Sequence, residues 1–184
     1  MRITGGKARG ISLRVPAGPV RPATDYLREA IFSSLAAWVP QAQVLDLFAG
    51  TGAYGLESLS RGAAAAVAVD EITVPTLNAN AAAVAKSMGL EALPFEAIKG
   101  DARRYDSPLR KFDLVFMDPP WDMWEREADL LVGTAAAAAA PGEHSRLILE
   151  APGGLTLPVA EGWRLHKVLG KGKGQPAASI FRRL

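Results

Sequence analysis

Apolar and polar positions follow two alternating periods along most of the chain. Short apolar runs that end in Asp, Gly or Pro indicate buried strands, and the segments between them repeat apolar residues at helical spacing. The runs predict strands at 43–48, 64–69, 93–98, 112–117 and 146–150, and two more near 163–169 and 177–182. Helices are predicted between them at 52–61, 72–88 and 123–139. This alternation predicts an α/β fold with a doubly wound, mostly parallel sheet.

The first 20 residues form a segment of their own. Residues 1–15 predict two short strands around a glycine-rich turn, which is either a basic hairpin or a flexible arm. After Pro22, either Thr24 or Asp25 is expected to cap a helix. The apolar residues of that helix are Leu27, Ala30, Ile31, Leu35 and Trp38. We therefore expect an N-terminal arm over 1–20 and one domain over 21–184.

Composition narrows the class of protein. The chain has 184 residues, 49% of them hydrophobic, which suffices for one domain with a substantial core. It has no cysteine, so disulfides and thiolate metal sites are excluded, and His144 and His166 lack metal-ligand spacing. The N-terminus lacks the apolar centre of a signal peptide, and no apolar run approaches the ~20 residues that span a bilayer. We expect a soluble cytoplasmic protein without a metal.

Charge is distributed unevenly along the chain. Residues 1–30 carry a net charge of +4, residues 31–161 carry −8, and residues 162–184 carry +6. Basic ends around an acidic centre suggest a polyanionic partner held at the periphery, although a solvated edge also shows such charges. The N-terminal residues expected to contact phosphates are Arg2, Lys7, Arg9, Arg14 and Arg21.

An Asp-Pro-Pro-Trp motif follows the predicted strand at 112–117. The Asp118 carboxylate and the Pro119 carbonyl are both suited to accept N–H groups from an exocyclic amine. Pro119 and Pro120 have a fixed φ and no amide proton, so the carbonyl keeps its direction. Trp121 offers a flat face for stacking on a planar base. The motif therefore predicts an amine-binding site, and the alternative is a strand that simply stops at a Pro-Pro turn.

A glycine loop lies further upstream, after the predicted strand at 43–48. Gly50, Gly52 and Gly55 satisfy the dinucleotide pattern G-x-G-x-x-G, and Asp70 lies 18 residues beyond Gly52. Taken alone, this pattern predicts NAD. Asp46, however, is expected near the mouth of the loop, where a carboxylate would repel a pyrophosphate but suits the amino and sulfonium groups of S-adenosylmethionine. Asp70 accepts hydrogen bonds from ribose hydroxyls in either case.

Topology is expected to bring the two motifs together. Ligands of a doubly wound sheet bind at the carboxyl ends of the strands, where the strand order reverses. If the strand that ends at Asp46 comes first, the reversal lies between it and the strand that ends at Asp118. Asp101, after the third strand, would reach the same edge and hold an adenine amine. Cofactor and target amine would then meet in one crevice.

The chain resembles the RsmD family, bacterial enzymes that methylate a guanine N2 of small-subunit (16S) ribosomal RNA. The similarity covers most of residues 1–121, and the helix segment is its most specific part. The matching stretches are Ile3–Gly10, Arg21–Phe32, Val44–Ala53, Leu56–Ala63 and Asp113–Pro120.

The resemblance implies a Rossmann-like class I methyltransferase fold with a seven-stranded sheet, S-adenosylmethionine as methyl donor, and a ribosomal RNA substrate within the small subunit. It implies acceptor residues Asp118, Pro119, Pro120 and Trp121. The cofactor residues that it implies are Thr24, Asp46, Phe48, Gly50, Thr51, Gly52, Asp70, Asp101 and Ala102.

The chain departs from the family pattern in three places. Trp121 replaces the usual Tyr, which preserves stacking but reshapes the base pocket. Ala23 and Tyr26 replace Thr and Arg in the helix segment. The turn at 171–177 lacks the expected Tyr-Gly. These changes keep the chemistry and leave the choice of nucleotide open.

Other functions remain open at this point. The same Asp-Pro-Pro-aromatic turn serves adenine N6 in DNA, and related turns serve protein glutamine, although 184 residues leave little room for a separate target-recognition region. A ribosome-assembly factor that kept the fold without turnover is a second alternative, and an NAD oxidoreductase is a third.

Overall fold

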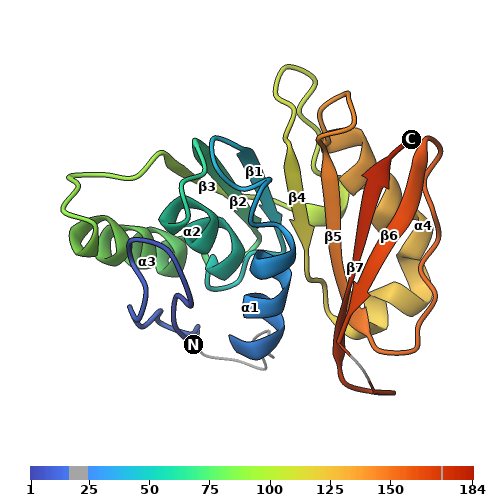
Figure 1. The fold of residues 1–184 in the computed structure, drawn as a ribbon, viewed down its shortest axis with the longest axis horizontal. Coiled ribbons are helices and arrows are strands. Elements are labelled where there is room, and N and C mark those ends of the chain that lie inside the picture. Colours follow the sequence, from blue (N-terminus) through green and yellow to red (C-terminus); the bar gives the residue numbers. More distant parts are fainter. Residues whose placement is uncertain (17–24, 171) are drawn as a thin grey trace.

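A single mixed sheet organises the chain, which we describe from a computed structural model over residues 1–16, 25–170 and 172–184 (Figure 1). Its strand order is β3-β2-β1-β4-β5-β7-β6. The first five strands in that order are parallel, and β7 is antiparallel to both β5 and β6. The strands are β1 Gln43–Leu47, β2 Ala65–Asp70, β3 Phe95–Lys99, β4 Leu114–Met117, β5 Arg146–Pro152, β6 Trp163–Leu169 and β7 Pro176–Arg183.

Helices cover both faces of this sheet. They are α1 Asp25–Ser34, α2 Ala53–Ser60, α3 Val74–Ser87 and α4 Trp121–Ala138, with a short 3-10 helix η1 at Ala102–Arg104. Figure 1 shows α1, α2 and α3 on one side of the sheet and α4 on the other. The predicted doubly wound α/β fold is therefore confirmed. None of the helices in the described residues is long and apolar enough to cross a lipid bilayer.

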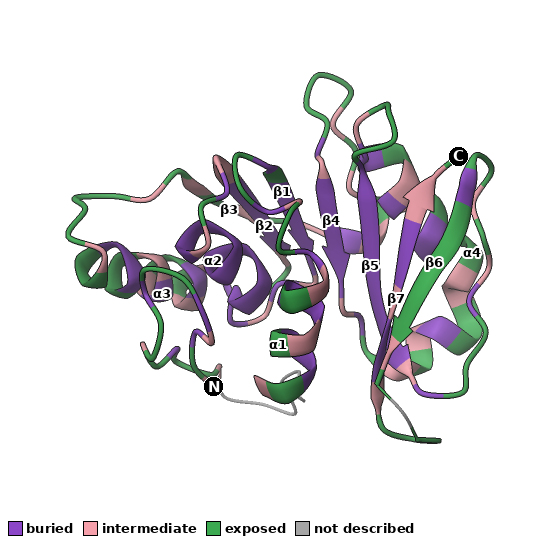
Figure 2. Cartoon of the chain, viewed as in Figure 1, coloured by how far each residue is buried: buried purple, intermediate pink, exposed green. Residues whose placement is uncertain are grey.

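The central strands are buried on both faces, as parallel strands between two helical layers should be. Val44, Phe116 and Ile148 pack with α1 in one cluster, whereas Leu45 and Leu149 pack with α4 in another. Residues of one strand thus alternate between the two layers. Figure 2 shows the contrast with β6, an edge strand that is mostly exposed.

Most predicted elements are present, with shifted ends. The helix predicted through Trp38 ends at Ser34, and the segment after it turns back toward β1 through a residue with positive φ, Gln41. The helix predicted from residue 123 begins two residues earlier, at Trp121, because Pro120 occupies its N-cap position. Proline is well suited to a helix start, since its missing N–H has no partner there.

The N-terminal segment is a docked hairpin. Of the two predicted strands, only one antiparallel bridge forms, between Arg2 and Ser12. Ile3, Ala8 and Leu13 are buried against α2 and α3. The Lys7 amide donates to the Ser60 carbonyl at 2.8 Å, and the Ala8 amide donates to the Ser60 hydroxyl at 2.9 Å. Packing and hydrogen bonds therefore fix residues 1–15 to the helical layer.

Candidate active site

The strand order reverses between β1 and β4, as predicted. β1 lies next to β2 on one side and β4 on the other, with Leu47 opposite Met117 in parallel register. The glycine loop follows β1 and the Asp-Pro-Pro-Trp motif follows β4, so both lie at the carboxyl edge of the sheet. The structure therefore brings the two motifs together at the position where doubly wound folds bind ligands.

The glycine loop turns sharply between β1 and α2. Phe48, Gly50 and Gly52 all have positive φ, at 60°, 54° and 77°. Gly52 is the N-cap of α2, and its amide donates to the Ala49 carbonyl at 2.7 Å. A Cβ at Gly52 would lie 2.9 Å from the Leu77 side chain. Backbone conformation and close approach thus both require glycine at this position.

Asp46 lies beneath the loop and not at its mouth, where we expected it. Its side chain is on the α2 face of β1, is 1% exposed, and accepts a hydrogen bond from the Gly55 amide at 3.0 Å. Burial raises the pKa of Asp46 to about 7, the Gly55 hydrogen bond opposes the rise, and the neighbouring Asp70 carboxylate adds to it. Asp46 is therefore a buried acid that shapes the loop from below.

Asp70 links two loops at the carboxyl edge. Its Oδ2 accepts a hydrogen bond from the Gly50 amide at 3.0 Å, which ties the end of β2 to the glycine loop. Its Oδ1 accepts from the amides of Ile72 and Thr73, both at 2.9 Å, at the start of α3. A carboxylate has about four acceptor positions, so these bonds leave room for a further donor.

The Asp-Pro-Pro-Trp motif forms the passage from β4 into α4. Asp118 is half-buried and its amide donates to the Leu47 carbonyl at 3.4 Å, which continues the β4–β1 pairing by one residue. Pro119 is buried and Pro120 is exposed. Trp121, the first residue of α4, is half-buried. The two prolines end the strand and start the helix, which fixes the direction of the Pro119 carbonyl.

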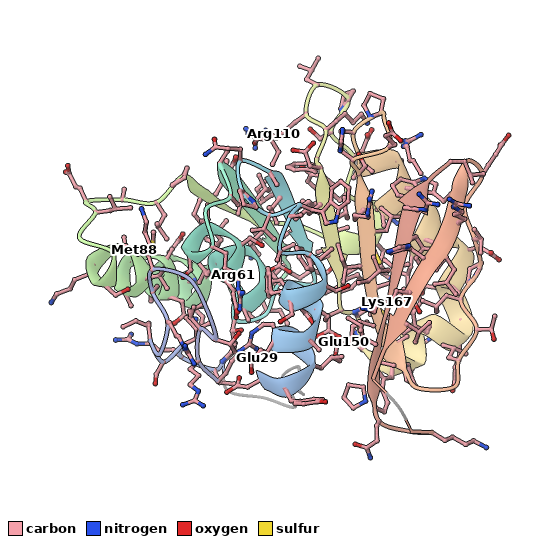
Figure 3. The ribbon with its side chains drawn as sticks, viewed as in Figure 1. Glu29, Arg61, Met88, Arg110, Glu150 and Lys167 are labelled. Atoms are coloured by element: carbon pink, nitrogen blue, oxygen red, sulfur yellow. The ribbon has the colours of Figure 1, made fainter. Side chains whose placement is uncertain are left out.

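Two residues of this region were missed by the sequence analysis. The Tyr54 hydroxyl donates to Glu150 Oε2 at 2.5 Å, and both residues are buried. Burial, followed by the charges of Glu150 and Asp46, raises the pKa of Asp118 well above its ordinary value. Glu150 directly follows the apolar run Leu147–Leu149 in the sequence, as Asp118 follows the run that forms β4, and an acid directly after such a run was the available signal. Figure 3 shows Glu150 beside α1.

Asp101 and Ala102 follow β3 at the same edge, in an arrangement that we did not expect. The guanidinium of Arg103 donates to both carboxylate oxygens of Asp101, at 2.9 Å from Nε and 2.7 Å from Nη2. This hydrogen bonding lowers the pKa of Asp101. Ala102 is buried among residues packed on α4. An open hollow of about 720 Å³ beside Asp101 is lined by residues of β3 and of the loop 104–110.

The remaining predicted residues are placed as follows. Thr51 is buried, and its hydroxyl lies 3.1 Å from the Met1 sulfur. Thr24 and Arg21 lie outside the described residues. The side chains of Arg2, Lys7, Arg9 and Arg14 are exposed on the N-terminal hairpin.

A buried ion-pair network connects this hairpin to the site. Arg28 of α1 is fully buried and donates from Nε to Glu57 of α2 at 2.8 Å. Its Nη2 donates to Asp25 at 2.7 Å and also to the Arg2 carbonyl. Arg61 donates to the same Glu57 at 2.8 Å. The network fastens the hairpin, α1 and α2 to one another.

Comparisons with known proteins agree with this architecture. Residues 1–175 match the family described as conserved hypothetical protein 95. The ribosomal RNA small subunit methyltransferase D of Escherichia coli K12 is 35% identical over 100% of this chain and 90% of its own length. The solved structure of Escherichia coli yhhF has a TM-score of 0.80 at 30% identity, covering 100% of this chain and 97% of that one. The structure of a hypothetical protein from Thermus thermophilus has a TM-score of 0.72 at 31% identity, covering 98% of each chain.

Proposed function

The chain belongs to the RsmD family, and from this premise we propose that it methylates the N2 amine of a guanine in small-subunit ribosomal RNA. Its fold is that of the class I S-adenosylmethionine-dependent methyltransferases. The observation that carries the proposal is the meeting of the glycine loop and the Asp-Pro-Pro-Trp turn at the β1–β4 reversal.

S-adenosylmethionine is the methyl donor, and the residues present fit it. Asp46 supplies buried negative charge beneath the loop, where a cationic ligand would relieve the cost of that charge. The absence of a side chain at Gly50, where a Cβ would meet only the Phe48 carbonyl oxygen at 4.0 Å, lets a ligand approach the backbone. Asp70, which already accepts from the Gly50 amide, is suited to accept from ribose hydroxyls as well. Asp101, beside the Arg103 guanidinium, is suited to accept from the adenine amine. When bound, the cofactor supplies an electrophilic methyl group on a sulfonium.

The acceptor side orients a weak nucleophile. The lone pair of a guanine amine is delocalised into the ring, so the nitrogen attacks poorly. Asp118 and the Pro119 carbonyl accept its two N–H groups, which favours a tetrahedral nitrogen and aims the lone pair at the methyl group. Trp121 stacks on the base. The gain comes from orientation and electrostatics, because no strong base is needed before transfer.

The nucleic acid is held by the basic N-terminal hairpin. A guanine N2 inside a helix is out of reach, so the substrate base is unpaired or flipped out of its stack. Arg2, Lys7, Arg9 and Arg14 are exposed and are suited to contact phosphates near that base. Arg21, one of the basic residues expected to contact phosphates, belongs to the same proposal, as does Thr24, which the resemblance assigns to the segment that closes over the cofactor.

Methyl transfer to small ribosomal subunits tests the function. Tritium from labelled S-adenosylmethionine is followed into subunits from a strain that lacks this gene, and the product nucleoside is identified. N2-methylguanosine is the expected product. Methyl on adenine N6, or transfer to duplex DNA or protein in place of subunits, would overturn the proposed acceptor.

The Asp118→Ala variant tests the site. It should lose methyl transfer while S-adenosylmethionine still binds, since Asp118 belongs to the acceptor side and Asp46, Asp70 and the loop remain. Isothermal titration calorimetry measures the binding. If the variant no longer binds the cofactor, the division of roles between the two motifs is wrong.

A further inference from the structure

Glu150 and Tyr54 form a rigid buried pair behind the acceptor carboxylate. The Tyr54 hydroxyl donates to Glu150 Oε2 at 2.5 Å. Tyr54 is 5% exposed and Glu150 is 3% exposed. The Tyr54 ring stacks on Phe116 of β4 with centroids 4.8 Å apart. The Glu150 carbonyl accepts from the Trp124 indole at 2.8 Å. Packing and hydrogen bonds therefore fix both partners.

Strand register places Glu150 next to Asp118. Met117 of β4 is opposite Leu149 of β5 in a parallel pairing, so the residues that follow them are neighbours across strands about 4.8 Å apart. Asp118 has the phase of Phe116 and Glu150 has the phase of Ile148, and both of those pack on the α1 face. The two carboxyl groups thus share one side of the sheet.

The groups around the two carboxyls are unequal. Glu150 faces two groups that favour its anion, the Tyr54 hydroxyl and the Arg28 guanidinium. They offset only part of the effect of burial, so the pKa of Glu150 stays above its ordinary value. Arg28 is fully buried, and its Nη1 makes no hydrogen bond within the described part of the chain. Asp118 faces two anions, Glu150 and Asp46. Of the two carboxyls, Asp118 is therefore the more basic.

We propose that Glu150, whose anion accepts a hydrogen bond from Tyr54, is a positioning residue that directs the proton released by methyl transfer onto Asp118. This inference rests on the proposed function. The nitrogen lone pair forms the new nitrogen–carbon bond as the sulfur–carbon bond breaks. The electron pair of the broken bond stays on sulfur. The methylated nitrogen then carries one proton too many. That proton passes to the Asp118 carboxylate, whose affinity for it is increased by the adjacent Glu150 charge, and it leaves to solvent with the product.

Carboxyl titration in the ligand-free protein tests the charge coupling directly. Side-chain carboxyl carbons of the wild type, Glu150→Gln and Tyr54→Phe are followed by NMR across pH. In Glu150→Gln, Asp118 should titrate at lower pH, because a like charge is gone. In Tyr54→Phe, Glu150 should titrate at higher pH, because its anion loses a donor. An unchanged Asp118 titration in Glu150→Gln would overturn the proposal.

The variants are chosen to keep the fold. Gln still offers an oxygen to the Tyr54 hydroxyl, and Phe retains the ring that stacks on Phe116. Glu161→Gln is the matched control, because it removes the same charge from an exposed position outside the site. Thermal unfolding of each variant checks that it folds.

The pH dependence of methyl transfer tests the consequence. In Glu150→Gln, kcat should fall by about 10- to 100-fold, while the KM for S-adenosylmethionine stays unchanged. The acid limb of the curve of kcat against pH should move to lower pH. Glu161→Gln should match the wild type. A wild-type pH profile in Glu150→Gln would overturn this proposal alone. A wild type that transfers no methyl group to subunits would overturn the proposed function and the proton step with it.

Discussion

At the scale of single residues, Asp46 shows a conflict between stability and binding. Its carboxyl is buried with one hydrogen bond from the Gly55 amide and another carboxylate, Asp70, nearby. Its pKa rises from 3.8 to about 7 in the folded chain. Between those values the folded state holds a proton that the unfolded state has lost, so the free energy of unfolding falls as pH rises through this window.

Asp46→Asn should remove that pH dependence. The amide still accepts from the Gly55 N–H but is never charged, so at pH 8 the variant should be more stable than the wild type by about 2–4 kcal/mol. Near pH 4 the two should be similar. Urea unfolding at a series of pH values gives the comparison. The same variant should bind S-adenosylmethionine more weakly, because a cationic ligand loses its counter-charge. Parallel stability curves for the two proteins would contradict the assignment.

The sequence predicted single residues only where a motif carried them. Asp118 and Gly52 were predicted because their neighbours identify a turn, whereas Glu150 and Tyr54 were missed because their relation depends on strand register and a helix crossing. Asp101 was predicted as a site residue, but its ion pair with Arg103 was not, since a salt bridge two residues apart depends on the local turn at η1. Contacts between distant segments require the fold.

At the scale of elements, the G-x-G-x-x-G pattern combines two kinds of glycine. Gly52 has a φ of 77° and a Cβ there would meet Leu77 at 2.9 Å. Gly55 lies within α2, and a Cβ there would make ordinary contacts, the nearest at 3.5 Å. Of these two glycines, the turn requires only Gly52, so the dinucleotide pattern overstates the need for Gly55.

Gly52→Ala and Gly55→Ala should therefore have opposite effects. Gly52→Ala should destabilise the fold by about 1–2 kcal/mol, because an L-residue is strained at this φ, and should weaken cofactor binding. Gly55→Ala should be neutral or stabilising by about 0.5–1 kcal/mol, because alanine favours a helix interior. Urea unfolding and calorimetric titration with S-adenosylmethionine measure both. Equal damage from the two substitutions would show that the space beside Gly55 is needed.

The N-terminal hairpin gives a second matched pair of glycines. Gly6 and Gly10 both have positive φ, at 79° and 91°. A Cβ at Gly6 would overlap the Ser60 carbonyl, which is backbone, whereas one at Gly10 would meet nothing within 4 Å. The backbone strain is shared, and the clash with α2 is confined to Gly6.

Gly6→Ala should release the hairpin from α2. It should cost about 1–3 kcal/mol more than Gly10→Ala, because the clash opens the Lys7–Ser60 hydrogen bond and the packing of Ala8. Hydrogen exchange at the Lys7 and Ala8 amides should accelerate in Gly6→Ala and stay near wild type in Gly10→Ala. Equal exchange in the two variants would mean that docking on Ser60 does not hold the segment.

At the scale of the whole molecule, the alternation of strands and helices was sufficient to predict the sheet and the reversal of its strand order. The positions of the basic residues relative to the site were not predictable. The basic residues of the C-terminal segment do not gather at the site. Arg182 of β7 lies opposite Arg146 at the amino end of β5 and opposite Arg164 of β6, at the edge of the sheet away from the site. Linear charge counts cannot distinguish the two ends of an antiparallel hairpin. The N-terminal hairpin, in contrast, reaches the glycine loop, where Met1 contacts Thr51 and the Arg14 amide donates to Asn80 at 2.8 Å.

This placement predicts which basic residues govern RNA affinity. Arg9 and Arg14 are exposed on the hairpin, whereas Lys111 lies at the amino end of β4, at the opposite edge of the sheet. In Arg9→Ala/Arg14→Ala, the slope of log K against log salt should decrease by about 0.7–0.9 for each lost phosphate contact. Lys111→Ala should leave the slope unchanged. Filter binding to small-subunit ribosomal RNA at several salt concentrations measures it. Since Arg14 keeps its backbone bonds to Asn80 in the variant, an unchanged slope would place the RNA on another face.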